Sequence, residues 1–249
     1  MTERKVKNRL LKHGQQHMRK RPTIIQFTRV NKYDVLLNDL DKNPHAFVIA
    51  CVMDRQIKAE LAWAIPWKLK DRIGDFSLDT LHRLSKRQLK KYLNSPFPLH
   101  RYTEKMPECL YSAIQIIGDD YDGDASLIWA NRPSSAEVVF RFLQIHGVGQ
   151  KIATMAANIL ARNFKIKFKD YYSIDVSVDV HIKRVFFRLG LTKRDASVDE
   201  VVYKARALYP EFPGLLDFPC WEVGRNWCGP KNMICGECYM GDVCPSYTI

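Results

Sequence analysis

Four cysteines near the end of the chain constrain its fold more than any other sequence feature. Cys228, Cys235, Cys238 and Cys244 follow the spacing C-x6-C-x2-C-x5-C. Such a set can form disulfides, bind a zinc ion through four thiolates, or bind a [4Fe–4S] cluster in the same way. Disulfides fit poorly, because the chain has seven cysteines and no apolar signal region follows its basic N-terminus.

The spacing favours the iron–sulfur cluster over the zinc ion. Zinc sites usually pair two short C-x2-C hairpins, whereas this segment has one close pair with a single cysteine on each side. One loop would then wrap around an object larger than an ion. The three other cysteines lie in apolar, helix-like segments and are expected to pack in the core, although the last of them can substitute as a ligand: Cys51, Cys109 and Cys220.

The rest of the chain is predicted to be mainly α-helical. Apolar residues recur at helical spacing, with Pro66 expected to break the third helix. Runs typical of β-strands are confined to residues 165–168 and 171–176. The expected helices span residues 33–40, 46–53, 57–72, 78–84, 86–93, 105–117, 134–145, 150–163, 180–189, 198–208 and 215–227.

The charge of the chain indicates a polyanionic partner. The sequence holds 39 Lys and Arg against 27 Asp and Glu, a net charge of +12. Residues 1–21 alone hold eight Lys and Arg against one Glu, so this tail or helix is expected to add phosphate contacts and to be dispensable for chemistry at low salt. The longest apolar run, residues 46–53, is far shorter than the ~20 residues of a membrane-spanning helix, so we expect no membrane partner.

A glycine-containing hairpin between two predicted helices is the other informative segment. Residues 143–153 read LQIHGVGQKIA, so one helix ends, Gly147 and Gly149 form a tight turn, and a second helix begins at once. Glycine lets the backbone approach a ligand closely, and the second helix points unpaired N–H groups and its positive dipole end outward. The segment is suited to a phosphate, with Val148 packed in the core. An ordinary helix–helix turn with a glycine cap is the alternative.

The I-x-G-V-G-x-K-x-A string resembles the helix-hairpin-helix motif of the DNA glycosylase superfamily, and within it the endonuclease III branch. Residues 178–184, VDVHIKR, are similar to the segment that carries the catalytic aspartate of that family. The cysteine spacing is that of its [4Fe–4S] loop, and residues 50–56, ACVMDRQ, resemble its base-pocket segment. The resemblance spans about residues 33–244. It implies a mainly α, two-lobed helix-hairpin-helix DNA glycosylase fold with a C-terminal iron–sulfur cluster loop.

The resemblance also implies an organisation and a partner. One lobe is expected over residues 37–163 and ends in the helix-hairpin-helix motif, and the other joins residues 1–36 to residues 164–249 and holds the cluster on the four cysteines of the loop. The partner implied is double-stranded DNA with a lesion or an abasic site. We expect a monomer that is cytoplasmic and associated with the nucleoid, or nuclear, and is not secreted.

Two residues are expected to carry the chemistry. Lys151 lies in the first turn of the second helix, where the helix dipole and desolvation favour the neutral amine. By resemblance it attacks C1′ of the deoxyribose, displaces the base and leads to strand cleavage; the alternative is a phosphate contact. Asp179 is expected at a helix N-cap, where its carboxylate can also stabilise charge at C1′. Residues 162–175 resemble an insertion that widens the interval between the two, and Asp175 is the alternative aspartate.

Further residues are expected to contact DNA. By resemblance, Gln56 would help to fill the space left by an extruded base, or would hydrogen-bond to the orphaned partner base, although Asp54 and Arg55 before it depart from the small residues usual in the family. Arg101, with its neighbours His100 and Tyr102, supplies the candidates for a wedge in the base stack. Phosphate contacts are expected from Gly147 and Gly149. His146 and Lys231 can each contact a phosphate or simply be exposed to solvent. The alternative functions are a monofunctional glycosylase, or a non-catalytic helix-hairpin-helix DNA-binding protein with a structural metal.

Overall fold

The computed structural model describes residues 3–247, and its contacts divide the chain into two compact units. The terminal unit consists of the described parts of Met1–Arg21 and Ala157–Ile249, together with Ser134–Val139. The middle unit consists of Pro22–Pro133 and Phe140–Ala156. The predicted lobes differ from these units at residues 22–36, 134–139 and 157–163, and their ends, residues 1–2 and 248–249, lie outside the described residues.

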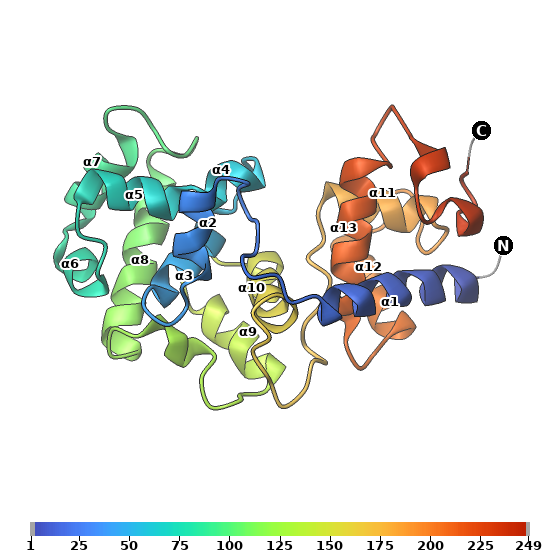
Figure 1. Ribbon diagram of the computed structural model, residues 1–249, viewed down its shortest axis with the longest axis horizontal. Coiled ribbons are helices and arrows are strands. Elements are labelled where there is room, and N and C mark those ends of the chain that lie inside the picture. Colours follow the sequence, from blue (N-terminus) through green and yellow to red (C-terminus); the bar gives the residue numbers. More distant parts are fainter. Residues whose placement is uncertain (1–2, 248–249) are drawn as a thin grey trace. The chain divides into compact units, whose positions relative to one another are not determined.

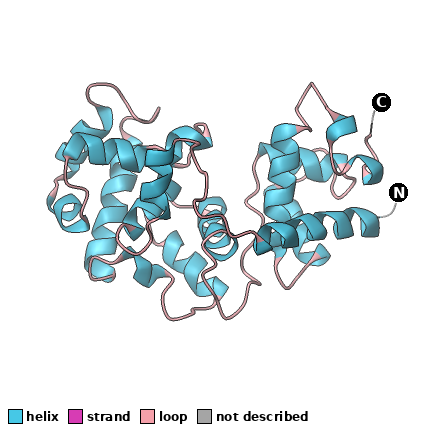
Figure 2. Cartoon of the chain, viewed as in Figure 1, coloured by secondary structure: helices cyan, strands magenta, loops and turns pink. Residues whose placement is uncertain are grey.

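The chain is mainly helical, as predicted (Figure 2). Within residues 3–247 the only β-type pairing is an isolated bridge between Cys228 and Met233. Each predicted helix is present, with ends within a few residues of those expected. The helix expected to break at Pro66 is divided in two, and this proline lies at the start of the second part. In the same part of the chain no helix is long and apolar enough to cross a membrane.

The middle unit is built around one buried helix, α3 (Pro44–Met53), all of whose residues are buried. A helix that is apolar on every side must lie inside the protein, and α3 packs against α8, α5 and α4 (Figure 1). The aromatic rings of Phe47, Trp63 and Trp129 fill the space beside it. The other elements are α2 (Asn31–Asn38), α4 (Ala59–Trp63), α5 (Ile65–Ile73), α6 (Leu78–Arg83), α7 (Lys86–Asn94), α8 (Lys105–Asp120) and the 3-10 turn η1 (Ala125–Ile128).

Two helices, α9 (Ser135–Leu143) and α10 (Gln150–Arg162), have their facing ends, Phe140–Leu143 and Gln150–Ala156, in the middle unit. The Oγ of Ser134 accepts a hydrogen bond from the backbone N–H of Glu137 at 3.2 Å, which caps the start of α9. The connection between the two helices is therefore part of the middle unit, where it carries the predicted hairpin.

The terminal unit has α11 packed on α13 at its centre, and α1 packs on α13 and on η2. Its core is made of residues from all of these elements, including Phe186, Leu216 and Val223. The elements are α1 (Glu3–Arg19), α11 (Val180–Arg188), α12 (Val198–Leu208), α13 (Asp217–Asn226) and the 3-10 turns η2 (Pro213–Leu216), η3 (Cys235–Glu237) and η4 (Gly241–Val243).

The basic N-terminal stretch is a helix and not a tail. Val6 and Leu10 on one side of α1 are almost completely buried in the core of the terminal unit. Arg9 forms two hydrogen bonds to the carboxylate of Asp242, at 2.9 and 2.6 Å, and one to the carbonyl oxygen of Tyr239 at 2.6 Å. The helix is thus part of the fold, which confirms the helical alternative, and its dispensability for chemistry at low salt stays a prediction.

The two β-like runs at residues 165–168 and 171–176 are loop, and the prediction of strands there is wrong. Their apolar residues alternate because single side chains, among them Phe168, Ile174 and Val176, are buried in the core. The backbone is held by scattered bonds, such as the one from Gly214 N–H to the Ile174 carbonyl oxygen at 2.6 Å. With no neighbouring strand to pair with, this alternation produces an anchored loop.

Candidate functional site

The two glycines of the hairpin have different roles. Gly147 has a φ of 86°, and a Cβ there would lie 2.5 Å from the Sγ of Cys109, so both the backbone and the packing exclude a side chain. Val148 is buried as predicted, and its N–H bonds to the Ile145 carbonyl oxygen at 2.9 Å. A Cβ at Gly149 would meet no atom within 4 Å. Gly147 therefore fixes the turn on the middle unit, while Gly149 leaves open space at the start of α10.

Lys151 and His146 are both exposed beside this open space. Lys151 lies in the first turn of α10, where the first N–H groups of a helix have no partner within the helix. Because Lys151 is exposed, the desolvation expected at this amine is not observed. The backbone N–H of His146 donates to the Oγ of Ser112 at 3.2 Å, which fixes the turn to α8 and leaves the imidazole in solvent.

The side chain of Arg55 joins the predicted base-pocket segment to the hairpin. The guanidinium of Arg55 donates a hydrogen bond to the carbonyl oxygen of Gly147, which is 92 positions away in the sequence. The next residue, Gln56, is exposed and has a φ of 52°, in the left-handed region that residues other than glycine seldom adopt. Gln56 is thus held in an uncommon conformation directly beside the Arg55 bridge.

His100 is buried and forms a hydrogen bond to the backbone of the same segment. It is 2% exposed; its Nδ1 accepts the backbone N–H of Tyr102 at 3.1 Å, and its Nε2 lies 3.1 Å from the Arg55 carbonyl oxygen. An Nδ1 that accepts must be unprotonated, so Nε2 carries the proton and donates. Burial lowers the pKa of His100, in agreement with this neutral form, although its bonds to carbonyl oxygens partly offset the effect. A buried imidazole is no candidate for a wedge.

Arg101 and Tyr102 both contact Gln56. The Tyr102 hydroxyl donates to the side-chain oxygen of Gln56, and the Arg101 guanidinium lies 5.1 Å above the Tyr102 ring. Arg101 also contacts the carbonyl oxygen of Gln56 at 3.4 Å. Two residues that the sequence predicted separately for DNA binding, Gln56 and Arg101, are therefore neighbours in the structure.

The predicted aspartate lies in the terminal unit at the start of α11. Asp179 is the N-cap, and its Oδ1 accepts the N–H groups of His181 and Ile182, each at 2.8 Å. The capping role is confirmed. The alternative, Asp175, is buried and forms a two-pronged ion pair with Arg206 at 2.7 and 2.8 Å. Asp175 is thus engaged inside the terminal unit, whereas Asp179 is only partly buried.

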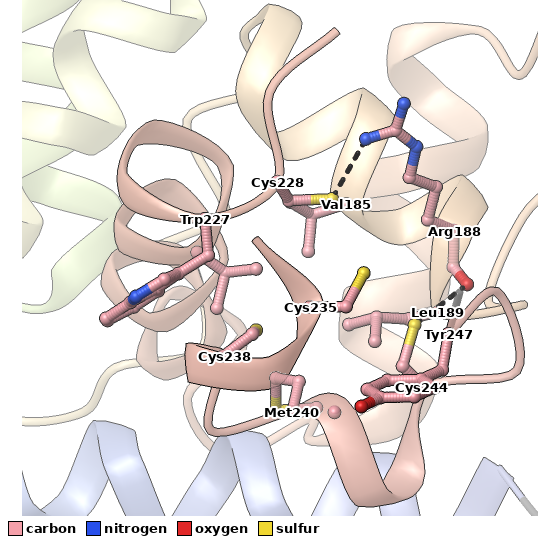
Figure 3. Close-up of a pocket in the computed structure, with 12 residues that line it drawn as sticks. Val185, Arg188, Leu189, Trp227, Cys228, Cys235, Cys238, Met240, Cys244 and Tyr247 are labelled. Carbon is pink, nitrogen blue, oxygen red and sulfur yellow. Dashed lines mark hydrogen bonds between the residues drawn. The ribbon is translucent and has the colours of Figure 1, made fainter. Parts of the chain in front are cut away.

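The four clustered cysteines line one cavity of the terminal unit. Figure 3 shows their side chains around the same hollow, which is partly open to solvent. The other lining side chains are mostly apolar, including Val185, Leu189 and Met240. Within residues 3–247 no group of three or more His, Cys, Asp or Glu is gathered closely enough to hold a single metal ion. Four thiols around one largely apolar hollow are a donor set that fits an iron–sulfur cluster.

Two arginines of α11 hold the start of the cysteine loop. Arg188 donates to the Sγ of Cys228 at 3.1 Å and to the Gly229 carbonyl oxygen at 2.7 Å, and Arg184 donates to the Cys228 carbonyl oxygen at 2.7 Å (Figure 3 shows the Arg188–Cys228 contact). Lys231, which follows, is exposed. Cys220 is completely buried and does not line the cavity, in agreement with its predicted packing role.

Sequence reasoning missed several residues that build these sites. Cys109 was expected only to pack in the core, yet its sulfur lies where a Gly147 side chain would lie. Ser112, Arg184 and Arg188 were not singled out as supports of the hairpin and the cysteine loop. Only Arg55 carried a signal in the sequence, since it departs from the small residues usual before the pocket glutamine.

The comparisons with known proteins agree with these observations. No model of a known protein family matches the chain. In sequence it is 29% identical over 145 residues to endonuclease III of Synechocystis sp., covering 55% of this chain and 54% of that protein. It is 31% identical over 116 residues to endonuclease III of Thermotoga maritima, covering 46% and 48%. The chain spans about half the length of the curated relatives that it matches.

Solved structures extend the likeness over nearly the whole chain. An endonuclease III trapped as a covalent intermediate on DNA superposes with a TM-score of 0.58, at 18% identity, over 89% of this chain and 97% of that one. The chain has the endonuclease III fold. A thermostable thymine-DNA glycosylase has the same fold, with a TM-score of 0.62, 16% identity and coverage of 98% and 95%. The resemblance that the motifs indicated is therefore confirmed, and at these identities the structures establish the fold alone.

Proposed function

We propose that this chain is a base-excision DNA glycosylase with AP lyase activity, acting on duplex DNA that contains a lesion or an abasic site. One observation carries the proposal: in a chain with the endonuclease III fold, Lys151 is exposed in the first turn of α10, beside the open space at Gly149. A phosphate bound at this helix start would bring a sugar of the same strand near the amine. Two solved structures of similar fold are a trapped endonuclease III–DNA covalent intermediate and an 8-oxoguanine glycosylase/lyase of Clostridium acetobutylicum.

In the proposed reaction, the neutral amine of Lys151 attacks C1′ of the deoxyribose of an extruded nucleotide. The bond between C1′ and the base nitrogen breaks, and the base leaves with the electron pair and takes up a proton. Opening of the sugar ring then gives a Schiff base between Lys151 and C1′. Loss of a proton from C2′ expels the 3′ phosphate, which nicks the strand by β-elimination.

Asp179 is proposed to face the same sugar. Its carboxylate is held by two N–H groups of α11, which keeps the charge fixed in place. A fixed carboxylate can stabilise positive charge that develops at C1′ and can accept a proton from the Lys151 ammonium group. The cap and the catalytic role are compatible, because both need the ionised form.

The other proposed DNA contacts are divided between the units. In the middle unit, Gln56 and Arg101 would approach the base opposite the lesion, and His146, Gly147 and Gly149 would approach a phosphate. In the terminal unit, Lys231 would approach another phosphate from the cysteine loop. These contacts agree with the exposure of Gln56, Arg101, His146, Gly149 and Lys231.

Borohydride trapping tests the proposal, because reduction converts the Schiff base into a stable amine. We expect the wild-type chain to form a covalent adduct with duplex DNA that carries an abasic site, and Lys151→Ala to form none. Lys91→Ala, which removes another exposed lysine of the middle unit, is the matched control and should trap normally. Asp179→Asn keeps a good N-cap while removing the charge, so it should fold normally and react about 10²-fold more slowly. An adduct that persists in Lys151→Ala would refute the assignment of the nucleophile.

We also propose a [4Fe–4S] cluster on Cys228, Cys235, Cys238 and Cys244. When bound through four thiolates, the cluster would cross-link the C-terminal loop and can exchange single electrons. The purified protein should then be yellow-brown, with broad absorption near ~400 nm, and should contain iron and acid-labile sulfide. Cys235→Ser should lose the colour, whereas Cys220→Ser, at a buried thiol outside the cavity, should keep it. A colourless protein that contains zinc would refute this assignment.

A further inference from the structure

Arg55 departs from the pattern of the family, and the proposed reaction does not use it. Its guanidinium donates a hydrogen bond from the segment that carries Gln56 to the Gly147 carbonyl oxygen of the hairpin. The side chain is only partly buried, and its hydrogen bond to Gly147 uses one of its five N–H donors. Arg55 therefore lies between two parts of the proposed DNA-binding surface of the middle unit.

The Gln56 segment is held firmly on one side by residues 100–102. His100 donates to the Arg55 carbonyl oxygen, Arg101 contacts the Gln56 carbonyl oxygen, and Tyr102 holds the Gln56 side chain. A left-handed residue other than glycine persists only when its surroundings fix it, and these three contacts do so. A shift of the Gln56 segment would therefore also move the Arg55 guanidinium. Through its hydrogen bond, that movement would reach the Gly147 carbonyl group of the hairpin.

The hairpin does not need Arg55 in order to form. Gly147 is already fixed against Cys109, Val148 is buried, and the His146 N–H is bound to Ser112. Removing the guanidinium should thus leave the fold intact while removing this hydrogen bond between the hairpin and the Gln56 segment. A variant that lacks the guanidinium can therefore show whether Arg55 positions the hairpin, without a loss of stability that would confuse the result.

We infer that Arg55 is a positioning residue that couples two recognition events: docking of the hairpin on a phosphate, and insertion of the Gln56 segment at the lesion. The inference rests on the proposed function. It deepens that function, because it assigns to Arg55 the preference for damaged over undamaged duplex, whereas a simple phosphate contact would strengthen binding to both equally.

Binding to two duplexes of the same sequence tests the inference. One carries a tetrahydrofuran abasic analogue, which cannot form a Schiff base, and the other is undamaged. For Arg55→Met we expect the preference for the abasic duplex, measured as the Kd of the undamaged duplex divided by the Kd of the abasic duplex, to fall about tenfold. This is the size expected for the loss of one charge-assisted hydrogen bond. Affinity for the undamaged duplex should change less than twofold, and Tm should stay within a few degrees. Arg83→Met, at an exposed arginine on α6, is the matched control and should leave the ratio unchanged.

The outcomes separate the inference from the proposed function. Equal weakening on both duplexes, or an unchanged ratio, would overturn the role of Arg55. If Arg55→Met does not fold, Arg55→Gln, which keeps a neutral donor, should show the same loss of preference, and a full preference there would also overturn it. A wild-type chain that prefers the abasic duplex but forms no borohydride adduct would overturn the lyase and leave the coupling by Arg55 in place.

Discussion

Replacing Gly147 by alanine should destabilise the hairpin by an amount that the structure allows us to divide into two parts. A side chain at a φ of 86° costs about 1–2 kcal/mol, because the Cβ crowds the following carbonyl oxygen. The new Cβ would also lie 2.5 Å from the Sγ of Cys109, and relieving such a clash in a packed core costs about 1–3 kcal/mol. We therefore expect Gly147→Ala to lower the free energy of unfolding by about 2–5 kcal/mol in urea denaturation at 25 °C.

Two further variants test the division. Cys109→Ala removes the sulfur that the new Cβ would meet. The double variant should therefore lose less free energy of unfolding than the two single variants lose together, and the difference should match the steric part. Gly149→Ala places a Cβ in open space and should change the free energy of unfolding by no more than about 0.5 kcal/mol. The same variant should weaken DNA binding, because the methyl group lies where a phosphate would approach. A loss below about 0.5 kcal/mol for Gly147→Ala, or no recovery in the double variant, would refute the reasoning.

Two further predictions concern the terminal unit. Deleting residues 1–21 should remove about 3–6 kcal/mol of stability, because Val6 and Leu10 each bury a side chain worth about 1.5–3 kcal/mol, and the Tm should fall accordingly. Stability should also fall in acid, because burial, followed by the charges of Lys20 and Arg162, lowers the pKa of His17 to about 4. A lowered pKa contributes stability above the unfolded value of 6.5, and this contribution is lost as the pH falls from 6.5 through about 4.

Each of these predictions has its own control. For α1, a variant that neutralises three exposed cations should keep the Tm of the wild type and only flatten the salt dependence of DNA binding; it combines Arg4→Gln, Lys12→Gln and Arg19→Gln. A truncated chain with an unchanged Tm would contradict the packing role of α1. For the pH effect, urea midpoints between pH 7 and pH 4.5 should depend less steeply on pH in His17→Gln. An equal slope in both proteins would show that His17 does not contribute.

Local sequence patterns were sufficient to predict many features of this protein. The helices follow from apolar residues at helical spacing, and their ends lie within a few residues of those expected. The N-cap at Asp179 and the buried Val148 are also as predicted, because a cap and a tight turn are determined by residues a few positions apart. The β-like runs at residues 165–176 were misassigned, since the same alternation can anchor a loop when no strand lies beside it.

The sequence by itself determined the helices, the hairpin and the spacing of the four cysteines, because near neighbours along the chain specify each of them. Only the tertiary structure decided which distant residues meet: Arg55 with Gly147, Tyr102 with Gln56, and the sulfur of Cys109 beneath the hairpin. It also decided that α1 belongs to the core. These contacts join positions tens to hundreds of residues apart, and they depend on how whole helices pack, which no local pattern records.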